Sequence, residues 1–364
     1  MKTTPACLKR LSHMLLVALT ACLTLSSCDD VIFDYEGDCD TRYHLRFRYD
    51  RNMKFADAFA NEVTSVRLMA FDSDGRLVWQ TEESGERLAS EGYDILLPLG
   101  PGDYTLTAWC GLGNGESFTV GEMPQGSAHS DAHCRLNRTA GPDGGAVSDK
   151  DLNRLFHGTL RVSLPVEEDG GDIYYTMPLT KDTNVFRVVL QHLSGQDISA
   201  DDFTFAIEDN NGWLAHDNSL RDDEKITYRA WSTYDASSGV DVPRSGGDWL
   251  ARQVEAPAGR AITQVSVAVA ELTVSRLVER DWTVNSKPVL VIRRADDGDL
   301  VARIPIIDFA LMVKGNYNRD MSNQEYLDRQ DEYNMTFFLD DDRHWLATSI
   351  IINSWRVVLN DVDF

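Results

Sequence analysis

Apolar and polar residues alternate in short runs along most of this chain. In residues 43–49, aromatic and aliphatic side chains occupy every second position, with basic residues between them. A period of two is typical of a β-strand with one buried face. Similar runs recur about every ten residues, for example at 203–207 and 333–339. The pattern therefore predicts a chain built mainly of strands.

Turn residues between these runs indicate hairpins. An Asp-Gly or Asn-Gly pair between two apolar runs is a strong local hairpin signal, and such pairs occur at 72–75, 209–212 and 296–298. Asp72 and Asp74 could also begin a calcium loop, but the distant Glu and the interior Gly of that motif do not follow. We therefore predict turns at these three positions.

Little of the pattern is helical. Ser322 and Glu325 stand three apart and form a capping box, which predicts a helix of about two turns that ends at Gln330. Phe55 and Phe59 are four residues apart and suggest a short helical patch.

Frequent strands with Gly-rich turns predict an all-β fold of two β-sandwiches in tandem with minor helical insertions, rather than βαβ units. The boundary is expected at 181–184, because a new strand opens at Val185. This division gives an N-terminal sandwich at 41–183 and a C-terminal sandwich at 184–364. One larger domain is the alternative.

The N-terminus has the three-part layout of an export signal. Lys2, Lys9 and Arg10 form its positive end, and residues 14–25 form an apolar run too short to span a bilayer. The run ends in Leu-Ser-Ser-Cys, where bacterial lipoprotein signals are cut. We predict that residues 1–27 are removed, that Cys28 is lipidated, and that 28–40 is a tether. An ordinary thiol beside a generic cleavage site or a short membrane anchor is the alternative.

The acidic pair after Cys28 adds information about the destination. Asp29 and Asp30 resemble the surface-export signal of Bacteroidota lipoproteins, while in other Gram-negative bacteria they could mean inner-membrane retention. A solvated start to a linker is the alternative. We expect a protein that is held to the outer membrane by its lipid and faces the cell surface.

Charge and composition exclude some partners. After removal of 27 residues, the remaining 337 carry 32 basic and 58 acidic groups, a formal net charge of −26. A surface with this much negative charge repels nucleic acid, and we therefore expect no nucleic-acid partner.

Three cysteines remain after the signal is removed and Cys28 is lipidated: Cys39, Cys110 and Cys134. The cell envelope is oxidising enough for one disulfide, and the sequence does not choose among the three pairings.

Catalytic and metal-binding motifs do not occur in the mature chain. It has no GxSxG elbow, Walker loop or dinucleotide fingerprint, and its histidines lack metal-ligand spacing. We therefore predict no enzyme activity, no cofactor and no metal. The eight Trp residues could stack on sugars, but in a sandwich most should fill cores.

Several segments together resemble the lipoprotein anchor and accessory subunits of Bacteroidales type V fimbriae, the minor-fimbria anchor family. The segments, in order, are 34–39, 47–50, 52–59, 108–111, 189–195, 326–333 and 352–358. The resemblance implies two transthyretin-like sandwiches. It also implies a non-enzymatic, lipidated subunit that attaches a fimbrial polymer to the outer membrane, takes part in its assembly and length control, and so serves cell adhesion.

The family's subunits join by strand exchange, in which backbone hydrogen bonds along a strand edge give affinity. The candidate strand is 350–359, because it is long, apolar and terminal. Its residues of interest are Ile350, Ile352, Trp355, Val357 and Leu359. A permanent core strand is the alternative. Expected partners are fimbrial stalk and accessory subunits, and the alternative function is that of a surface glycan-binding lipoprotein.

Overall fold

The computed structural model describes residues 41–166, 170–192, 194–238, 265–283, 286–315, 318–340, 345–352 and 355–358. By its contacts the chain divides into a small unit, Met1–Arg42 with Val166–Ile173, and a large unit, Tyr43–Pro165 with Tyr174–Phe364. Within the small unit, Arg42 Nε donates to Asp172 Oδ1 at 2.7 Å. Most strands of both predicted sandwiches fall in the large unit.

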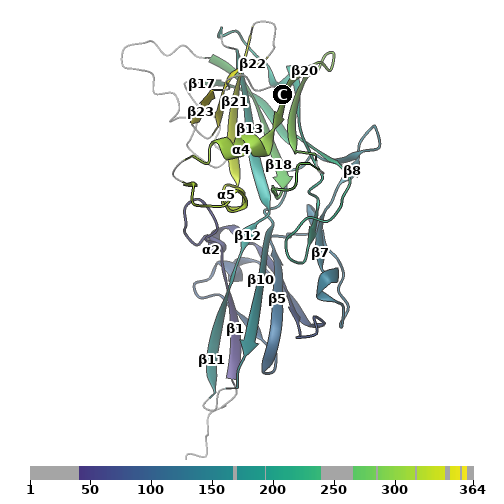
Figure 1. The fold of residues 1–364 in the computed structure, drawn as a ribbon, viewed down its shortest axis with the longest axis vertical. Helices are drawn as coiled ribbons and strands as arrows, with labels where there is room; N and C mark the ends of the chain where they lie inside the picture. The colour runs from purple at the N-terminus through teal and green to yellow at the C-terminus, as the bar shows by residue number, and fades with distance from the viewer. Residues whose placement is uncertain are drawn as a thin grey trace, which may run out of the picture. The chain divides into compact units, whose positions relative to one another are not determined.

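The first two sheets use the early part of the chain (Figure 1). A three-stranded sheet has the order β11 (Gly171–Pro178), β1 (Thr41–Arg48) and β4 (Ile95–Leu97). A five-stranded sheet has the order β12 (Thr180–Lys181), β10 (Phe156–Leu164), β5 (Gly102–Cys110), β2 (Ser65–Phe71) and β3 (Leu77–Ser84).

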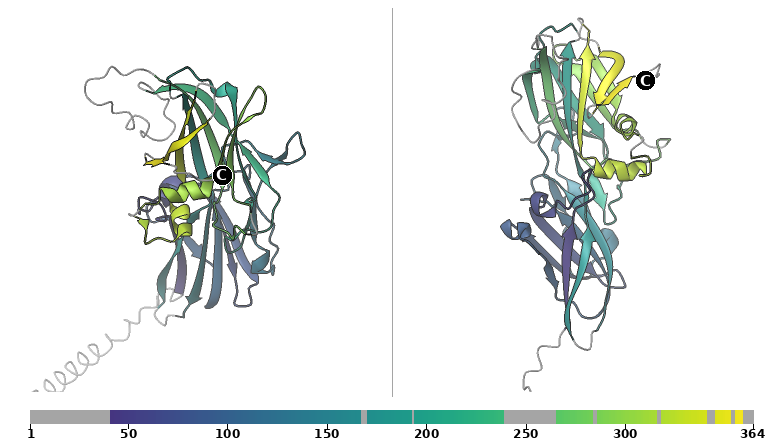
Figure 2. Two further views of the ribbon diagram at one scale, coloured as in Figure 1. Left: turned by 45° about the horizontal axis from the view of Figure 1, so that its top comes forward. Right: turned by 90° about the vertical axis from the view of Figure 1, so that its left-hand side faces the viewer.

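Two six-stranded sheets form most of the later part of the chain, which is coloured from teal to yellow in Figure 2. One has the order β17 (Ser232–Ser238), β18 (Val265–Ser275), β13 (Thr183–His192), β21 (Glu332–Leu339), β22 (Trp345–Ile352) and β23 (Trp355–Val358). The other has the order β20 (Leu300–Pro305), β19 (Val289–Arg294), β14 (Phe203–Asp209), β16 (Ile226–Arg229), β9 (Ala146–Ser148) and β8 (Thr139–Ala140).

A last sheet of three short strands joins distant segments: β15 (Trp213–Ala215), β7 (His133–Leu136) and β6 (Phe118–Val120). The α-helices are α2 (Phe59–Glu62), α4 (Ile306–Met312) and α5 (Asn323–Arg329), and the 3-10 turns are η1 (Glu86–Ala89), η2 (His129–Asp131) and η3 (Ala200–Asp202). None of the helices in the described ranges is long and apolar enough to cross a bilayer. The all-β prediction is confirmed.

Strand β13 lies at the centre of its sheet. It pairs antiparallel with β18 and parallel with β21. Phe186, Val188 and Leu190 alternate along it and are fully buried, and Phe186 stacks on Tyr333 of β21 at 4.9 Å. Burying a side chain of this kind contributes about 1.5 to 3 kcal/mol. These three side chains form one face of the core, while Val189 on the opposite face is buried with Val267 and Val269.

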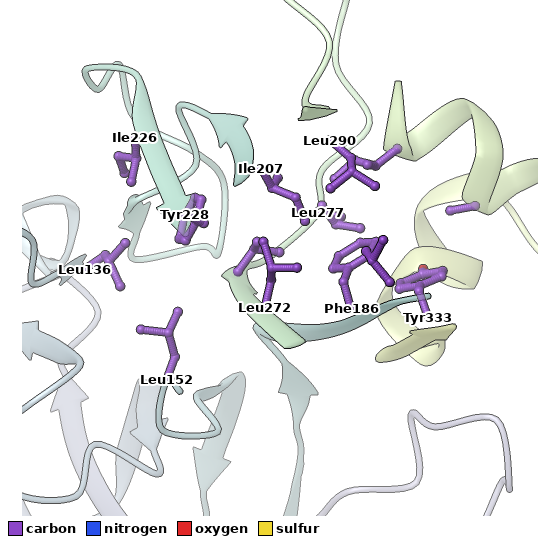
Figure 3. Packing of buried hydrophobic residues seen from close by; sticks show 14 of the residues in the cluster. Leu136, Leu152, Phe186, Ile207, Ile226, Tyr228, Leu272, Leu277, Leu290 and Tyr333 are labelled. Atoms are coloured by element: carbon purple, nitrogen blue, oxygen red, sulfur yellow. The ribbon is translucent and has the colours of Figure 1, made fainter. Parts of the chain in front are cut away.

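The core extends beyond one pair of sheets (Figure 3). Leu136 and Leu152, from the segment between β6 and β10, join the same buried cluster as Tyr228 and Leu272. Strand β9 pairs parallel with β16, and β7 pairs antiparallel with β15. The early part of the chain therefore contributes strands and side chains to the later sheets, and the boundary at 183/184 stays a prediction.

The local predictions have mixed outcomes. The hairpin turns at 72–75 and 296–298 are confirmed by the pairing of β2 with β3 and of β19 with β20. The helix capped by Ser322 is confirmed as α5, where Ser322 Oγ accepts from Glu325 N at 3.0 Å. The hairpin at 209–212 is wrong, because β14 pairs with β16 and β19 while β15 pairs with β7.

The predicted short helical patch is confirmed only from Phe59 onward, and its extension back to Phe55 is wrong. The helix α2 begins only at Phe59, and Phe55 has φ of +53°. Phe59 is buried and stacks on Phe47 at 5.5 Å and on Tyr93 at 5.8 Å. Tertiary packing of one aromatic residue has overridden the local i, i+4 pattern.

Candidate functional site

The predicted attachment residue Cys28 lies outside the described residues, as does Cys39. Cys110 on β5 and Cys134 on β7 are buried free thiols, and no disulfide joins them in the described part of the chain. Burial raises the pKa of both thiols well above its ordinary value. They are therefore protonated core residues.

The candidate strand-exchange segment is divided between two strands. β22 ends at Ile352 and β23 covers Trp355–Val358, and these strands pair antiparallel at the edge of the six-stranded sheet. Ile350 lies opposite both Phe337 and Val357. Leu359 lies outside the described residues, and the side chains of the other four candidates are not described.

A cluster of charges connects the early and late parts of the chain. Lys181, which lies on β12 at the end of the first predicted sandwich, places Nζ 2.8 Å from Glu62 Oε2 and 2.5 Å from Asp331 Oδ2. Burial lowers the pKa of Lys181, but the carboxylates of Asp331 and Glu62 outweigh that effect, so the pKa lies above its ordinary value. Lys181 is therefore charged, and it ties α2 to the start of β21.

The next residue along the chain, Asp182, is fully buried. Its Oδ1 accepts from Asn218 Nδ2 at 2.8 Å and lies 3.7 Å from Arg276 Nε, and its Oδ2 has no hydrogen-bond partner among the described residues. Burial raises the pKa of Asp182 to about 7, against the lowering effect of Arg276 and Asn218. This carboxyl therefore titrates near neutral pH.

Three histidines, His129, His157 and His216, lie close together at strands β5 and β10. The rings of His129 and His216 lie 4.5 Å apart, His129 Nε2 is 2.8 Å from Thr107 Oγ1, and His157 Nε2 is 3.0 Å from the His216 carbonyl. Burial lowers the pKa of His157 to about 4, and burial with the neighbouring His216 lowers the pKa of His129 to about 4. Among the described residues no three His, Cys, Asp or Glu side chains are placed to hold a metal. His129 also packs on Phe71 at 4.4 Å, and His157 packs on Trp109 at 5.3 Å.

The same sheet face is open farther along β5 and β10. An open groove of about 550 Å³ lies there, next to the turn between β2 and β3. Asp103 lies opposite Ser163, and Thr105 lies opposite Arg161, so these four side chains share one face of the strand pair. The groove therefore offers a carboxylate, a guanidinium and hydroxyl groups to solvent. No Trp lines this groove among the described residues; Trp109 is fully buried and Trp282 packs against the main core.

A loop at 50–57 presents one exposed aromatic ring. Phe55 is 57% exposed, and the guanidinium carbon of Arg329, on α5, lies 4.7 Å from the centre of its ring. Arg329 Nη1 also donates to the Asp50 carbonyl at 3.0 Å. The loop is thus attached to α5 while most of the ring faces solvent.

Comparison with known proteins places this chain in a known family. The family described as "Fimbrillin-A associated anchor proteins Mfa1 and Mfa2" matches residues 35–361. The chain belongs to that family. The family is one of fimbrial anchor proteins, which agrees with the resemblance found in the sequence.

Individual relatives give the same result. The "Minor fimbrium anchoring subunit Mfa2" of Porphyromonas gingivalis is 28% identical over 167 residues, which cover 44% of this chain and 49% of that protein. The alignment therefore spans about half the length of that relative. A solved structure described as a "putative adhesin" from Bacteroides thetaiotaomicron is 34% identical, with a TM-score of 0.75 over 89% of this chain and 100% of that one.

A second solved structure, also from Bacteroides thetaiotaomicron, is described as "putative polysaccharide binding proteins". It is 28% identical, with a TM-score of 0.70 over 88% of this chain and 99% of that one. The anchor family and the all-β fold that the sequence indicated are thus both confirmed.

The sequence marked Lys181 and Asp182 only as part of the expected boundary at 181–184, and it gave no sign that they or Arg276 form buried charged contacts. The available signal was small: Lys181 and Asp182 interrupt a largely apolar stretch at 177–190. Their partners lie far away in the chain, and no spacing rule relates Asp182 to Asn218 or Arg276.

Proposed function

We propose that this protein is a lipid-anchored fimbrial subunit that attaches a fimbrial polymer to the outer membrane, facing the cell surface, and takes part in its assembly and length control. The observation that carries the proposal is the family match over 35–361, which begins shortly after the candidate attachment residue Cys28. The role is structural and serves cell adhesion. We propose no enzymatic activity.

The attachment rests on simple energetics. Each buried CH₂ of an acyl chain contributes about 0.8 kcal/mol, so one chain holds a protein only marginally and two or three hold it firmly. A fimbria adds drag to its anchor, so several chains on Cys28 suit the load better than a protein contact alone. The strands at 41–358 then only need to stay folded and hold the next subunit.

Replacement of Cys28 tests the attachment. In cells, residues 1–27 are exchanged for a signal peptide whose cleavage needs no cysteine, and Cys28 is changed to Ala. We expect the protein to leave the membrane fraction and the fimbriae to appear in the medium. The variant Cys39→Ala, with the native signal, is the matched control and should keep both on the cell. Retention of the Cys28→Ala protein and its fimbriae would refute lipid anchoring.

Crosslinking in cells tests the partner. We expect a fimbrial stalk or accessory subunit as the main crosslinked neighbour. A carbohydrate importer as the main product would contradict the anchoring role.

We further propose that β22 and β23, with Ile350, Ile352, Trp355 and Val357, act as permanent strands of their sheet. β22 pairs antiparallel with β21, and β23 pairs antiparallel with β22, which supports this alternative over donation to another subunit. Deletion of 345–364 should then abolish folding. A well-folded truncated protein that no longer joins the fimbria would support donation.

Glycan binding is a second candidate function, and the groove on β5 and β10 favours it. An anionic ligand would meet the carboxylates of Asp72 and Asp103, and a polycation would meet Arg161, so the mixed lining suits a neutral polyhydroxylated ligand. The relative described as a polysaccharide binding protein supports this candidate. Titration calorimetry with neutral oligosaccharides should show binding that Arg161→Ala and Asp103→Ala remove. If both variants still bind the oligosaccharide, the binding site lies outside this groove.

A further inference from the structure

The loop at 50–57 is fixed by the side chain of Asn52. Asn52 Nδ2 donates to the carbonyls of Tyr49 at 3.1 Å and Ala56 at 2.8 Å, and its Oδ1 accepts from Lys54 N at 3.0 Å. The backbone N–H of Phe55 donates to the Asn52 carbonyl at 3.1 Å. One buried amide thus determines the path of the chain on both sides of Phe55.

The end of the loop is fixed in the same way. Asp57 Oδ1 accepts from Tyr49 N at 3.0 Å and from Phe59 N at 3.0 Å, and the N–H of Ala58 donates to the Tyr49 carbonyl at 2.9 Å. Side chains that bond local backbone groups replace secondary structure in such loops. The loop therefore has one defined conformation.

Phe55 occupies an unfavourable backbone conformation within this rigid loop. Its φ of +53° lies in the left-handed region, where a bulky residue other than Gly is an outlier. Such strain persists when the surroundings impose it, and it is concentrated at functional positions. Glycine or asparagine would fit here with less strain, so the backbone does not explain the phenylalanine.

Packing does not explain the phenylalanine either. Phe59, four residues later, is 5% exposed and packs in the core, whereas Phe55 is 57% exposed. Arg329 covers one face of the Phe55 ring. Arg329 is also held by Glu325 Oε1 at 2.9 Å and by the Asp50 carbonyl, so its position does not depend on the ring. A rigid loop thus presents an aromatic ring whose remaining surface faces solvent.

From this geometry we infer that Phe55 is an anchor residue that inserts into an apolar pocket of the fimbrial subunit held by this protein. Rigid, preorganised aromatic residues dominate protein interfaces, because little conformational freedom is lost when they bind. The inference rests on the proposed anchoring function, which makes a fimbrial subunit the partner, and it names a contact separate from any strand edge.

Charge beside the ring specifies the partner further. Lys54 is exposed, and in the described part of the chain its ammonium has no carboxylate partner. The chain as a whole carries a formal net charge of −23, whereas Lys54 and Arg329 place two positive charges next to the exposed ring. We expect a carboxylate at the rim of the partner's pocket.

Variants that relieve the strain test the inference. The full-length protein and the fimbrial stalk subunit of the same bacterium are purified. The affinity for the stalk subunit and the thermal midpoint are then measured for Phe55→Gly and Phe55→Asn. Both variants should keep or raise the midpoint, because φ of +53° suits them, while the affinity falls at least about tenfold. Lys54→Glu should weaken binding in a salt-dependent manner. Leu300→Ala, which shortens another exposed apolar side chain, is the control and should change neither quantity.

Each outcome has one meaning. Affinity within about twofold of wild type for Phe55→Gly would overturn the inference and leave anchoring intact. A lowered thermal midpoint that Phe55→Leu restores together with the affinity would show that Phe55 is a structural residue, and this too would overturn the inference. If the wild-type protein does not bind the stalk subunit and cells lacking it keep their fimbriae, the proposed function itself fails.

Discussion

The guanidinium of Arg276 holds the carboxylate of Asp328 through two hydrogen bonds of 2.9 Å, one from Nε to Oδ1 and one from Nη2 to Oδ2. Arg276 directly follows β18 and Asp328 lies on α5, so this pair fixes the helix to the end of the sheet. Gln324 Nε2 adds a third hydrogen bond to Asp328 at 2.8 Å. Two-point pairs of this kind combine strength with a defined geometry.

Removal of this guanidinium should be strongly destabilising. Arg276→Met leaves the buried carboxylates of Asp328 and Asp182 without their cation, and we expect the free energy of unfolding to fall by about 3 to 5 kcal/mol. Urea denaturation measures the change. Arg294→Met, which breaks an exposed pair with Asp296, is the control and should leave the midpoint unchanged. Equal effects of the two substitutions would contradict the role of the buried pair.

Asp182 should make stability depend on pH. Its pKa is raised to about 7 by burial, from an ordinary value of 3.8. The folded protein therefore keeps a proton that the unfolded chain loses, and this carboxyl stabilises the fold below about pH 4 and ceases to do so as pH rises to about 7. The loss is at most about 1.4 kcal/mol per pH unit.

Asp182→Asn should remove this dependence. The free energy of unfolding of both proteins is measured at pH 4.5, 6.0 and 7.5. Subtracting one curve from the other removes the contributions of His129 and His157, which both proteins share. We expect the free energy of unfolding of the variant to increase relative to that of the wild type as pH rises. Parallel curves would show that Asp182 is already ionised in the fold.

Cys110 and Cys134 should be unreactive in the folded protein. Both thiols are buried with a raised pKa, so neither the thiolate nor access for a reagent is available. In a Cys39→Ser protein, the number of thiols that react with a chromogenic disulfide should increase by two when the protein is unfolded in guanidinium. An increase of less than two would mean that a thiol is exposed or bonded in the native state.

Gly111 should tolerate no side chain. Its φ is +77°, and a Cβ would lie 1.8 Å from the Arg154 carbonyl oxygen, so backbone would have to move. We expect Gly111→Ala to lower stability by about 3 kcal/mol or more or to prevent folding. Gly75 has φ of +70° with open space around it, so Gly75→Ala should cost only about 1 kcal/mol. Soluble yield and thermal midpoint distinguish the two, and equal losses would contradict the clash.

Local signals in the sequence predicted local structure well. The Asp-Gly turn at 72–75 fixes a hairpin through its own side chain, since Asp72 Oδ1 accepts from the N–H groups of Asp74 and Arg76. Ser322 caps α5 for the same reason. In both cases the residues that determine the conformation lie within four positions of one another, so they can be recognised without knowledge of the fold.

These local signals did not predict which distant segments of the chain pair with one another. The turn at 209–212 looks like a hairpin, but the partner of β15 is β7, about eighty residues earlier. Phe55 and Phe59 share a local pattern, but within the described ranges Phe59 alone of the two has aromatic neighbours, at Phe47 and Tyr93. The buried partners of Asp182 come from two further segments of the chain. Such choices depend on which surfaces meet after collapse, and spacing along the chain does not record this.

The parallel contact between β9 and β16 has a consequence for the order in which the chain folds. Ala146 lies opposite Ile226, so a sheet containing residues up to Pro305 also needs a strand that was synthesised long before. Contacts between such distant positions form slowly, because a long loop must close first. Most of the polypeptide must therefore have been synthesised before that sheet can be completed, and until then the edges of its strands stay unpaired.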